Sequence, residues 1–133
     1  MSRYTYTSLG TEIPPAPLIE VKLSTPGDNP LQTLNCTAFL DSGSDCTLVP
    51  LDLLIKVNAV VSGARAVVQG TSQGKTIVIP YFVGLSFDRF VYPAIQVRGC
   101  SSEALGGIIL IGRDLLNNFI LELNGKELTF TIT

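Results

Sequence analysis

Residues 39–45 read Phe-Leu-Asp-Ser-Gly-Ser-Asp and place a carboxylate, Asp41, directly after an apolar run. Gly43 lets the backbone turn tightly, and Ser42 can hydrogen-bond across the loop that such a turn forms. The same tripeptide ends many ordinary strands, so by itself it does not distinguish a structural turn from a functional loop.

Strand patterns lie on both sides of this loop. Residues 18–23 alternate apolar and polar side chains, and residues 34–40 form a second apolar run that leads into Asp41. Residues 47–50 leave the loop as a further short strand, and residues 52–57 predict a short turn of helix. The loop is therefore expected between two strands.

Two glycines, Gly70 and Gly74, separate two β-rich runs at residues 66–69 and 75–83. This pattern predicts a hairpin whose polar tip has little to bury, so we expect that tip to be mobile. Residues 87–97 predict one or two more strands.

The C-terminal part begins with a short apolar strand at residues 108–111 and a helix at residues 113–118. Residues 119–123 and 127–132 then flank Asn124-Gly125, a strong hairpin signal. Residues 1–16, which contain Pro14-Pro15, predict an extended arm ahead of one domain at 17–133. The expected fold is all-β.

Composition narrows the range of partners. Hydrophobic residues make up 46% of the 133 residues and charged residues 15%, with a net charge of −2 and no basic run. We therefore expect a packed core, and neither nucleic acid nor an anionic membrane as partner. The apolar stretches are too short to span a bilayer, and the first residues do not form a signal peptide, so we expect a cytoplasmic protein.

The chain contains no histidine, which excludes Ser-His-Asp and Cys-His hydrolysis and almost every catalytic zinc site. Its three cysteines, Cys36, Cys46 and Cys100, are an odd number without a close pair, which predicts free thiols rather than a disulfide framework. We expect no metal ion and no cofactor. If the protein is a hydrolase, carboxylates must perform the chemistry.

A second motif, Ile-Gly-Arg-Asp-Leu-Leu at residues 111–116, changes the interpretation of Asp41. The order of apolar residues, Asp-Ser-Gly, a glycine-tipped hairpin and this motif resembles the retropepsins over residues 17–133. Retropepsins are the aspartic proteases of retroviruses and of related cellular and bacterial proteins. The resemblance implies a closed barrel with a flap hairpin and one short C-terminal helix, acting as a symmetric homodimer.

The resemblance also implies roles for single residues. Asp41 matches the catalytic aspartate, and Ser42 and Gly43 complete its loop. Asp45 matches an acid that holds the substrate main chain and pairs with an arginine, here Arg113, and we expect that ion pair to be buried. The other positions that the resemblance implies for substrate binding are Ser44, Gly70, Thr71, Ser72, Ile108 and Leu110.

Three departures from the family pattern matter. Ala16 stands where many viral members carry an arginine that reaches the partner subunit. Ser44 replaces a frequent alanine, and we expect its hydroxyl to donate to the Asp41 carboxylate and lower the pKa of the catalytic pair. The chain also adds the hairpin at Asn124-Gly125, and we expect its last strand to be an open edge that pairs with a two-fold copy.

The expected reaction is hydrolysis of a peptide or protein substrate by a water that two carboxylates activate while sharing one proton. The chain holds one Asp-Ser-Gly, so the partner must be another copy of itself. Two alternatives stay open: a catalytically silent dimerisation or peptide-binding module of the same fold, and a monomeric β-barrel domain completed by a different protein.

Overall fold

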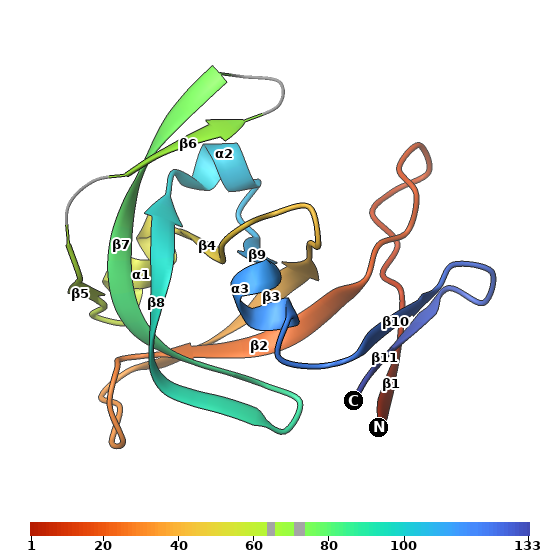
Figure 1. Ribbon diagram of the computed structural model, residues 1–133, viewed down its shortest axis with the longest axis horizontal. Helices are drawn as coiled ribbons and strands as arrows, with labels where there is room; N and C mark the ends of the chain where they lie inside the picture. Colours follow the sequence, from red (N-terminus) through yellow and green to blue (C-terminus); the bar gives the residue numbers. More distant parts are fainter. Residues whose placement is uncertain (64–65, 71–73) are drawn as a thin grey trace.

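Strands dominate the computed structural model, which describes residues 1–63, 66–70 and 74–133 (Figure 1). Strands account for 49% of the chain and helices for 12%, and six strands close into a barrel. The expected mainly-β fold with a closed barrel is confirmed. None of the described helices is long and apolar enough to cross a lipid bilayer.

The elements match most of the predicted segments. The strands are β1 (Ser2–Thr5), β2 (Leu18–Ser24), β3 (Thr33–Leu40), β4 (Leu48–Pro50), β5 (Val60–Val61), β6 (Ala66–Gly70), β7 (Gly74–Phe87), β8 (Phe90–Cys100), β9 (Ile109–Ile111), β10 (Leu121–Asn124) and β11 (Thr129–Ile132). The helices are α1 (Leu51–Lys56), α2 (Ser102–Leu105) and α3 (Arg113–Leu116).

Helix α3 is the short C-terminal helix that the sequence predicts, and α1 matches the turn of helix predicted at residues 52–57, whereas α2 was not predicted. Helix α2 has four residues, too few to show a helical period in the sequence. Its ends are nevertheless well defined. The Ser101 hydroxyl accepts a hydrogen bond from the Ala104 amide, and Gly106 ends the helix in the left-handed region at φ 63°.

The barrel closes through the pairing of β2 with β7. The hydrogen-bonded order is β2-β3-β9-β4-β8-β7, and Leu23 of β2 lies opposite Leu85 of β7 to complete the ring. A register shift between Val83 and Leu85 bends β7 at this point. A Cβ on Gly84 would displace the Ser24 hydroxyl and lie 3.3 Å from two backbone carbonyl oxygens, so glycine eases the close pairing of the two strands.

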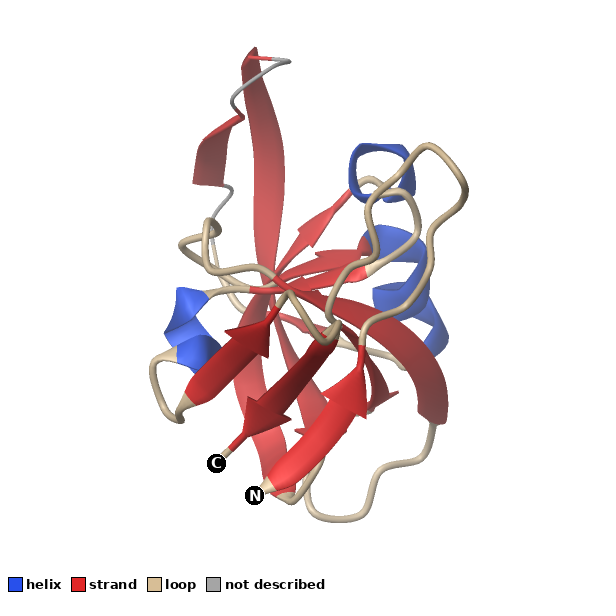
Figure 2. Ribbon diagram, turned by 90° about the vertical axis from the view of Figure 1, so that its right-hand side faces the viewer, coloured by secondary structure: helices blue, strands red, loops and turns tan. Residues whose placement is uncertain are grey.

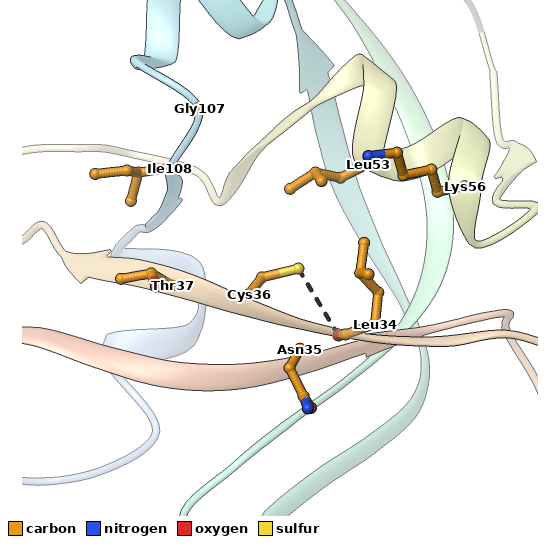
Figure 3. A pocket seen from close by; sticks show the side chains of 8 residues that line it. All are labelled: Leu34, Asn35, Cys36, Thr37, Leu53, Lys56, Gly107 and Ile108. Atoms are coloured by element: carbon orange, nitrogen blue, oxygen red, sulfur yellow. Dashed lines mark hydrogen bonds between the residues drawn. The ribbon is translucent and has the colours of Figure 1, made fainter.

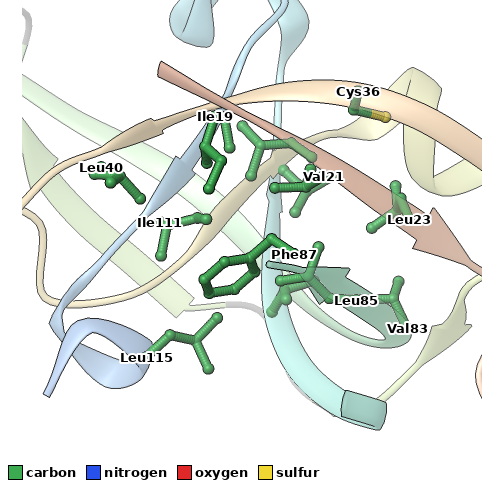
Figure 4. Packing of buried hydrophobic residues seen from close by; sticks show 14 of the residues in the cluster. Ile19, Val21, Leu23, Cys36, Leu40, Val83, Leu85, Phe87, Ile111 and Leu115 are labelled. Atoms are coloured by element: carbon green, nitrogen blue, oxygen red, sulfur yellow. The ribbon is translucent and has the colours of Figure 1, made fainter. Parts of the chain in front are cut away.

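The apolar core fills this barrel (Figure 4). Ile19, Val21 and Leu23 occupy alternate positions of β2 and are all buried, as the alternation in the sequence predicts. Ile109 and Ile111 of β9 are fully buried against them. Burial of each such side chain contributes on the order of 1.5–3 kcal/mol, and it holds β9 beside the strand that leads to Asp41.

A separate three-stranded sheet, in the order β1-β11-β10, brings the two termini side by side (Figure 2). Phe130 and Ile132 of β11 are fully buried, and Tyr4 stacks on Phe130 with 5.1 Å between the ring centroids. The expectation of an open edge at the last strand is therefore wrong. The arm at residues 1–16 supplies β1, which covers that edge.

The predicted hairpin around the two glycines is present. Strands β6 and β7 pair in antiparallel register, with Gly70 opposite Gly74. Two predicted substrate-binding residues, Thr71 and Ser72, lie outside the described residues, as does the expectation of a mobile tip.

Candidate active site

The backbone around Asp41 fixes the position of its carboxylate. Asp41 directly follows β3, and its amide donates to the Ile111 carbonyl of β9 at 2.9 Å. The Gly43 amide donates to Oδ1 of Asp41 at 3.0 Å, and the Ser44 amide donates to the Asp41 carbonyl at 3.1 Å. The side chain is half-buried, so the carboxylate is anchored and still reaches the surface.

Gly43 keeps space beside that carboxylate. A Cβ at Gly43 would lie 3.2 Å from Oδ1 of Asp41, a tight contact that the loop would have to relieve. The absence of a side chain therefore lets the Gly43 amide approach the carboxylate closely enough to donate.

Gly112 brings the second motif into backbone contact with the Asp41 loop. A Cβ at Gly112 would lie 2.4 Å from the Cys46 carbonyl oxygen, so only glycine fits here without a backbone shift. The Gly112 amide donates to the Thr47 hydroxyl oxygen at 3.2 Å. The Arg113 amide donates to the Ser44 carbonyl at 2.9 Å. The two motifs that the sequence singled out therefore meet in one site.

Thr47 and Asp114 form a partly buried link between these segments, and sequence reasoning missed both. The Thr47 side chain is fully buried, and its amide and hydroxyl both donate to the Asp114 carboxylate. Asp114 also accepts a hydrogen bond from the Leu115 amide in the first turn of α3. The position of Asp114 next to Arg113 in the motif was the available signal, but nothing in the sequence shows its pairing with Thr47.

Arg113 holds the outer side of the loop. One guanidinium nitrogen donates to the Ser42 carbonyl at 2.7 Å, and the other forms an ion pair with the Asp45 carboxylate. The predicted pairing of Asp45 with Arg113 is present. The predicted burial is wrong, because the Asp45 side chain is 88% exposed and the Arg113 side chain 44%. The pair lies at the surface, so its contribution to stability is expected to be small.

Ser44 does not contact the Asp41 carboxylate. Its hydroxyl donates to the Cys46 carbonyl at 2.7 Å, so the expected hydrogen bond to Asp41 is wrong. The acceptor is a backbone group two residues away, and such local bonds from serine compete with longer-range ones. The Ser44 hydroxyl therefore bonds within the loop backbone and not to the Asp41 side chain.

The remaining predicted site residues lie on different elements. Leu110 is half-buried on β9 and points away from the face that Ile109 and Ile111 bury. Ile108 precedes β9 and lines a pocket with β3 and α1. Gly70 ends the strand β6 of the hairpin.

Cys46 carries the thiol of the loop, and this thiol has low reactivity. All three cysteines are free. Desolvation raises the pKa of the Cys46 thiol despite the opposing charge of Arg98, and burial likewise raises the pKa of Cys36. Both thiols therefore stay protonated at neutral pH and are poor nucleophiles.

No protein-family model matches the sequence, and no curated protein matches it. The family resemblance therefore stays a prediction that rests on the motifs and on the geometry of their meeting point.

Proposed function

We propose that this chain is an aspartic endopeptidase that works as a homodimer, with one Asp41 from each subunit. The observation that carries the proposal is the anchored loop. Hydrogen bonds from the Asp41 amide to Ile111 and from the Gly43 amide to the Asp41 side chain hold the carboxylate in place. The lack of a side chain at Gly112 lets the second motif lie against the backbone of the same loop. A positioned carboxylate of this kind is what acid–base hydrolysis requires.

A single chain supplies one of the two carboxylates that the reaction needs. Two neighbouring carboxylates share one proton, because two negative charges at such close range repel each other strongly. The ionised member takes a proton from a water that attacks the peptide carbonyl, and the protonated member donates to the carbonyl oxygen.

The other acidic side chains near the loop already have partners within the chain. A second copy of the chain is therefore the favoured source of the second carboxylate. Asp45 pairs with Arg113, and Asp114 accepts two hydrogen bonds from Thr47. A two-fold axis next to the loop would bring Asp41 opposite its copy.

The free edge of β10 is the surface that fits this second copy. The backbone of Ile120 exchanges hydrogen bonds with Thr133, so the amides of Leu121 and Leu123 point to the side away from β11. The order β1-β11-β10 leaves that side unpaired among the described strands. Leu123 is 51% exposed and Ile120 69% exposed beside it. Antiparallel pairing of β10 with its copy would satisfy the amides and cover these apolar side chains.

A peptide library incubated with the purified protein tests the activity. We expect cleavage by the natural chain and loss of several orders of magnitude in rate in Asp41→Asn, since an amide cannot accept the proton of the water. Asp52→Asn, an exposed substitution in α1, is the matched control and should cleave normally. A folded Asp41→Asn chain with full activity would refute the proposal.

A mixing experiment tests the source of the second carboxylate. Random exchange of natural and Asp41→Asn subunits at equal amounts should lower the activity per natural chain by about half, because each site needs two copies. Activity that stays unchanged after exchange would show that the second carboxylate comes from elsewhere.

A further inference from the structure

Four half-buried side chains form a row on the face of the barrel wall that points away from the core. They lie on adjacent strands, in the order Phe39 of β3, Leu110 of β9, Leu48 of β4 and Arg98 of β8. The pairing registers align them, and residues aligned across strands point to the same face of a sheet. Their neighbours in the sequence point to the opposite face and belong to the core: Ala38, Leu40, Val49, Val97, Ile109 and Ile111. We call the four half-buried side chains the outer row.

The outer row begins next to Asp41. Asp41 comes two positions after Phe39, and its amide continues the pairing with β9 by donating to the Ile111 carbonyl. Alternate residues of an extended chain share a face, so Asp41 and Phe39 lie on the same side of the barrel wall. A peptide bound at Asp41 therefore lies against the outer row.

The pocket shown in Figure 3 is a separate surface. It has a volume of about 440 Å³ and lies between β3 and α1. Its lining includes no member of the outer row and consists of residues 34–37, Leu53, Lys56 and residues 107–108. The surface that continues from Asp41 is therefore the outer row and not this pocket.

Arg98 is the charged member of the outer row and lies at the end farthest from Asp41. Neighbouring strands are about 4.8 Å apart, so three strand spacings place Arg98 about 14 Å from Phe39. An extended peptide, at about 3.3 Å per residue, covers this distance in about four residues. The long side chain of Arg98 brings the guanidinium closer to the cleaved bond. Arg98 is therefore within reach of a peptide side chain about two to four residues from that bond.

The charge of Arg98 acts on the Asp41 loop. Desolvation raises the pKa of the Cys46 thiol in this loop, and the charge of Arg98 is the largest effect that opposes it. Charges act strongly on one another only at short range in a protein at ordinary salt. The location of Arg98 near the loop thus agrees with the one that the strand registers give.

The acids near the same loop already have partners. Asp45 and Asp114 both raise the pKa of the neighbouring thiol, but Asp45 pairs with Arg113, and Asp114 accepts two hydrogen bonds from Thr47. Among the described residues, no carboxylate lies at ion-pair distance from Arg98. The complementary group is therefore a carboxylate on the bound peptide, which a guanidinium can bind through two parallel hydrogen bonds.

We propose that Arg98 determines the specificity of the protease by selecting substrates with a glutamate or aspartate about two to four residues from the cleaved bond. This inference rests on the proposed endopeptidase function. A two-fold axis next to Asp41 places one Arg98 on each side of the cleaved bond. The acidic preference should therefore occur on both sides of that bond.

The test begins with a synthetic peptide library that is cleaved by the natural chain. We expect glutamate and aspartate to be enriched over glutamine and asparagine about two to four residues from the cleaved bonds. The best-cleaved peptide is then compared with two versions of itself, in which glutamine or lysine replaces the acid. The kcat/KM should fall about three- to tenfold with glutamine, as for a partly exposed ion pair, and further with lysine.

Two variants test whether Arg98 makes this contact. Arg98→Gln should cleave the glutamate and glutamine peptides at equal rates, and Arg98→Glu should favour the lysine peptide over the glutamate peptide. A preference that reverses when the charges of both partners are exchanged is the mark of a direct contact and not of a structural role. Arg89→Gln removes the same charge from the exposed turn between β7 and β8. It is the matched control and should keep the preference of the natural chain.

Each contrary result has its own meaning. Cleavage by the natural chain without an acidic preference would overturn this inference and leave the protease proposal standing, whether or not the variants fold. An acidic preference that persists in Arg98→Gln would assign it to another cation and overturn the role of Arg98. Dissociation of Arg98→Gln into monomers in the ultracentrifuge would assign Arg98 to the contact between the two copies instead. The absence of any cleavage by the natural chain would refute this inference and the protease proposal together.

Discussion

Thr47 and Asp114 are joined by two hydrogen bonds, from the Thr47 amide to Oδ2 at 3.0 Å and from the Thr47 hydroxyl to Oδ1 at 2.8 Å. Thr47 is fully buried, and Asp114 lies in the first turn of α3. This contact is a partly buried fastening between the Asp41 loop and the helix, whereas the ion pair of Arg113 is exposed. The two links should therefore respond differently to mutation.

Asp114→Ala should lower the free energy of unfolding by about 1–3 kcal/mol, because it leaves the buried amide and hydroxyl of Thr47 without their acceptor. Urea denaturation measures the loss. Asp52→Ala removes an acid from the first turn of α1, where it is exposed, and serves as the control. Equal losses in both variants would show that the fastening does not stabilise the fold.

Arg113→Ala should lower the free energy of unfolding by about 1 kcal/mol or less, as expected for an exposed pair and far below the ~3–5 kcal/mol of a buried one. Its effect on cleavage should be larger, because Ser42 and Asp45 both lose the contact that orders them. Thermal melts and cleavage rates of the same preparation compare the two effects, with Lys126→Ala as control. A melt as strongly affected as that of Asp114→Ala would contradict the surface location.

Ser44→Ala should leave the pH profile of cleavage where it is in the natural chain. The Ser44 hydroxyl donates to the Cys46 carbonyl, so its removal takes no hydrogen bond from Asp41. Stability should fall by about 0.5–1.5 kcal/mol, as for a typical hydrogen bond. Rates measured across the acid and neutral range decide the point. A profile displaced to higher pH would show that the hydroxyl contacts Asp41 in the working dimer.

Asp88 should contribute stability that acid removes. It accepts hydrogen bonds from the Ser2 and Tyr4 hydroxyls at 3.1 and 2.9 Å. Desolvation raises the pKa of Asp88, but these bonds and the neighbouring Arg89 outweigh it and lower the pKa below the ordinary 3.8. A depressed carboxyl pKa means stability that is present above the unfolded-state value and lost as the pH falls through the folded-state value.

The matching measurement is the free energy of unfolding of Asp88→Asn and the natural chain at about pH 7 and pH 3. The natural chain should be the more stable at neutral pH by less than about 1 kcal/mol, since the site is exposed, and the difference should shrink in acid. A stability difference that grows in acid would contradict a lowered pKa of Asp88 in the folded state.

Leu123→Pro should weaken self-association at least about tenfold, because each subunit loses an amide that points to the free edge of β10. The bonds to β11 come from the alternate residues, so the three-stranded sheet should survive. Leu123→Thr keeps the amide and is the control. Analytical ultracentrifugation gives both dissociation constants, and equal values would place the dimer contact on another surface.

Local patterns explain what the sequence could predict. Alternation at residues 18–23 predicts β2, and Asn124-Gly125 predicts the hairpin of β10 and β11, because both signals lie within a few residues. The pairing of Asp45 with Arg113, which joins the Asp41 loop to the second motif, was inferred from a resemblance and not from periodicity.

The contacts that the sequence did not predict join residues that are distant in the sequence or lack a local pattern. Residues 2–5 show no preference for a partner, so their pairing with β11 could not be inferred. The bond between Thr47 and Asp114 spans 67 positions, and single-sequence patterns do not report such distances. The acceptor of Ser44 depends on the exact path of the loop, which propensities do not determine.

The contact between the Asp41 loop and the segment around Gly112 also determines when the site can exist. The bond from Asp41 to Ile111 and the fastening of Thr47 to Asp114 join residues about 70 positions apart. Such contacts require a long loop to close first, so they form late in folding and slow it. A partly folded chain therefore carries Asp41 without its bond to Ile111 and keeps at most the local bond from Gly43. The carboxylate becomes competent only as the last long-range contacts of the barrel are made, which ties any activity to completed folding.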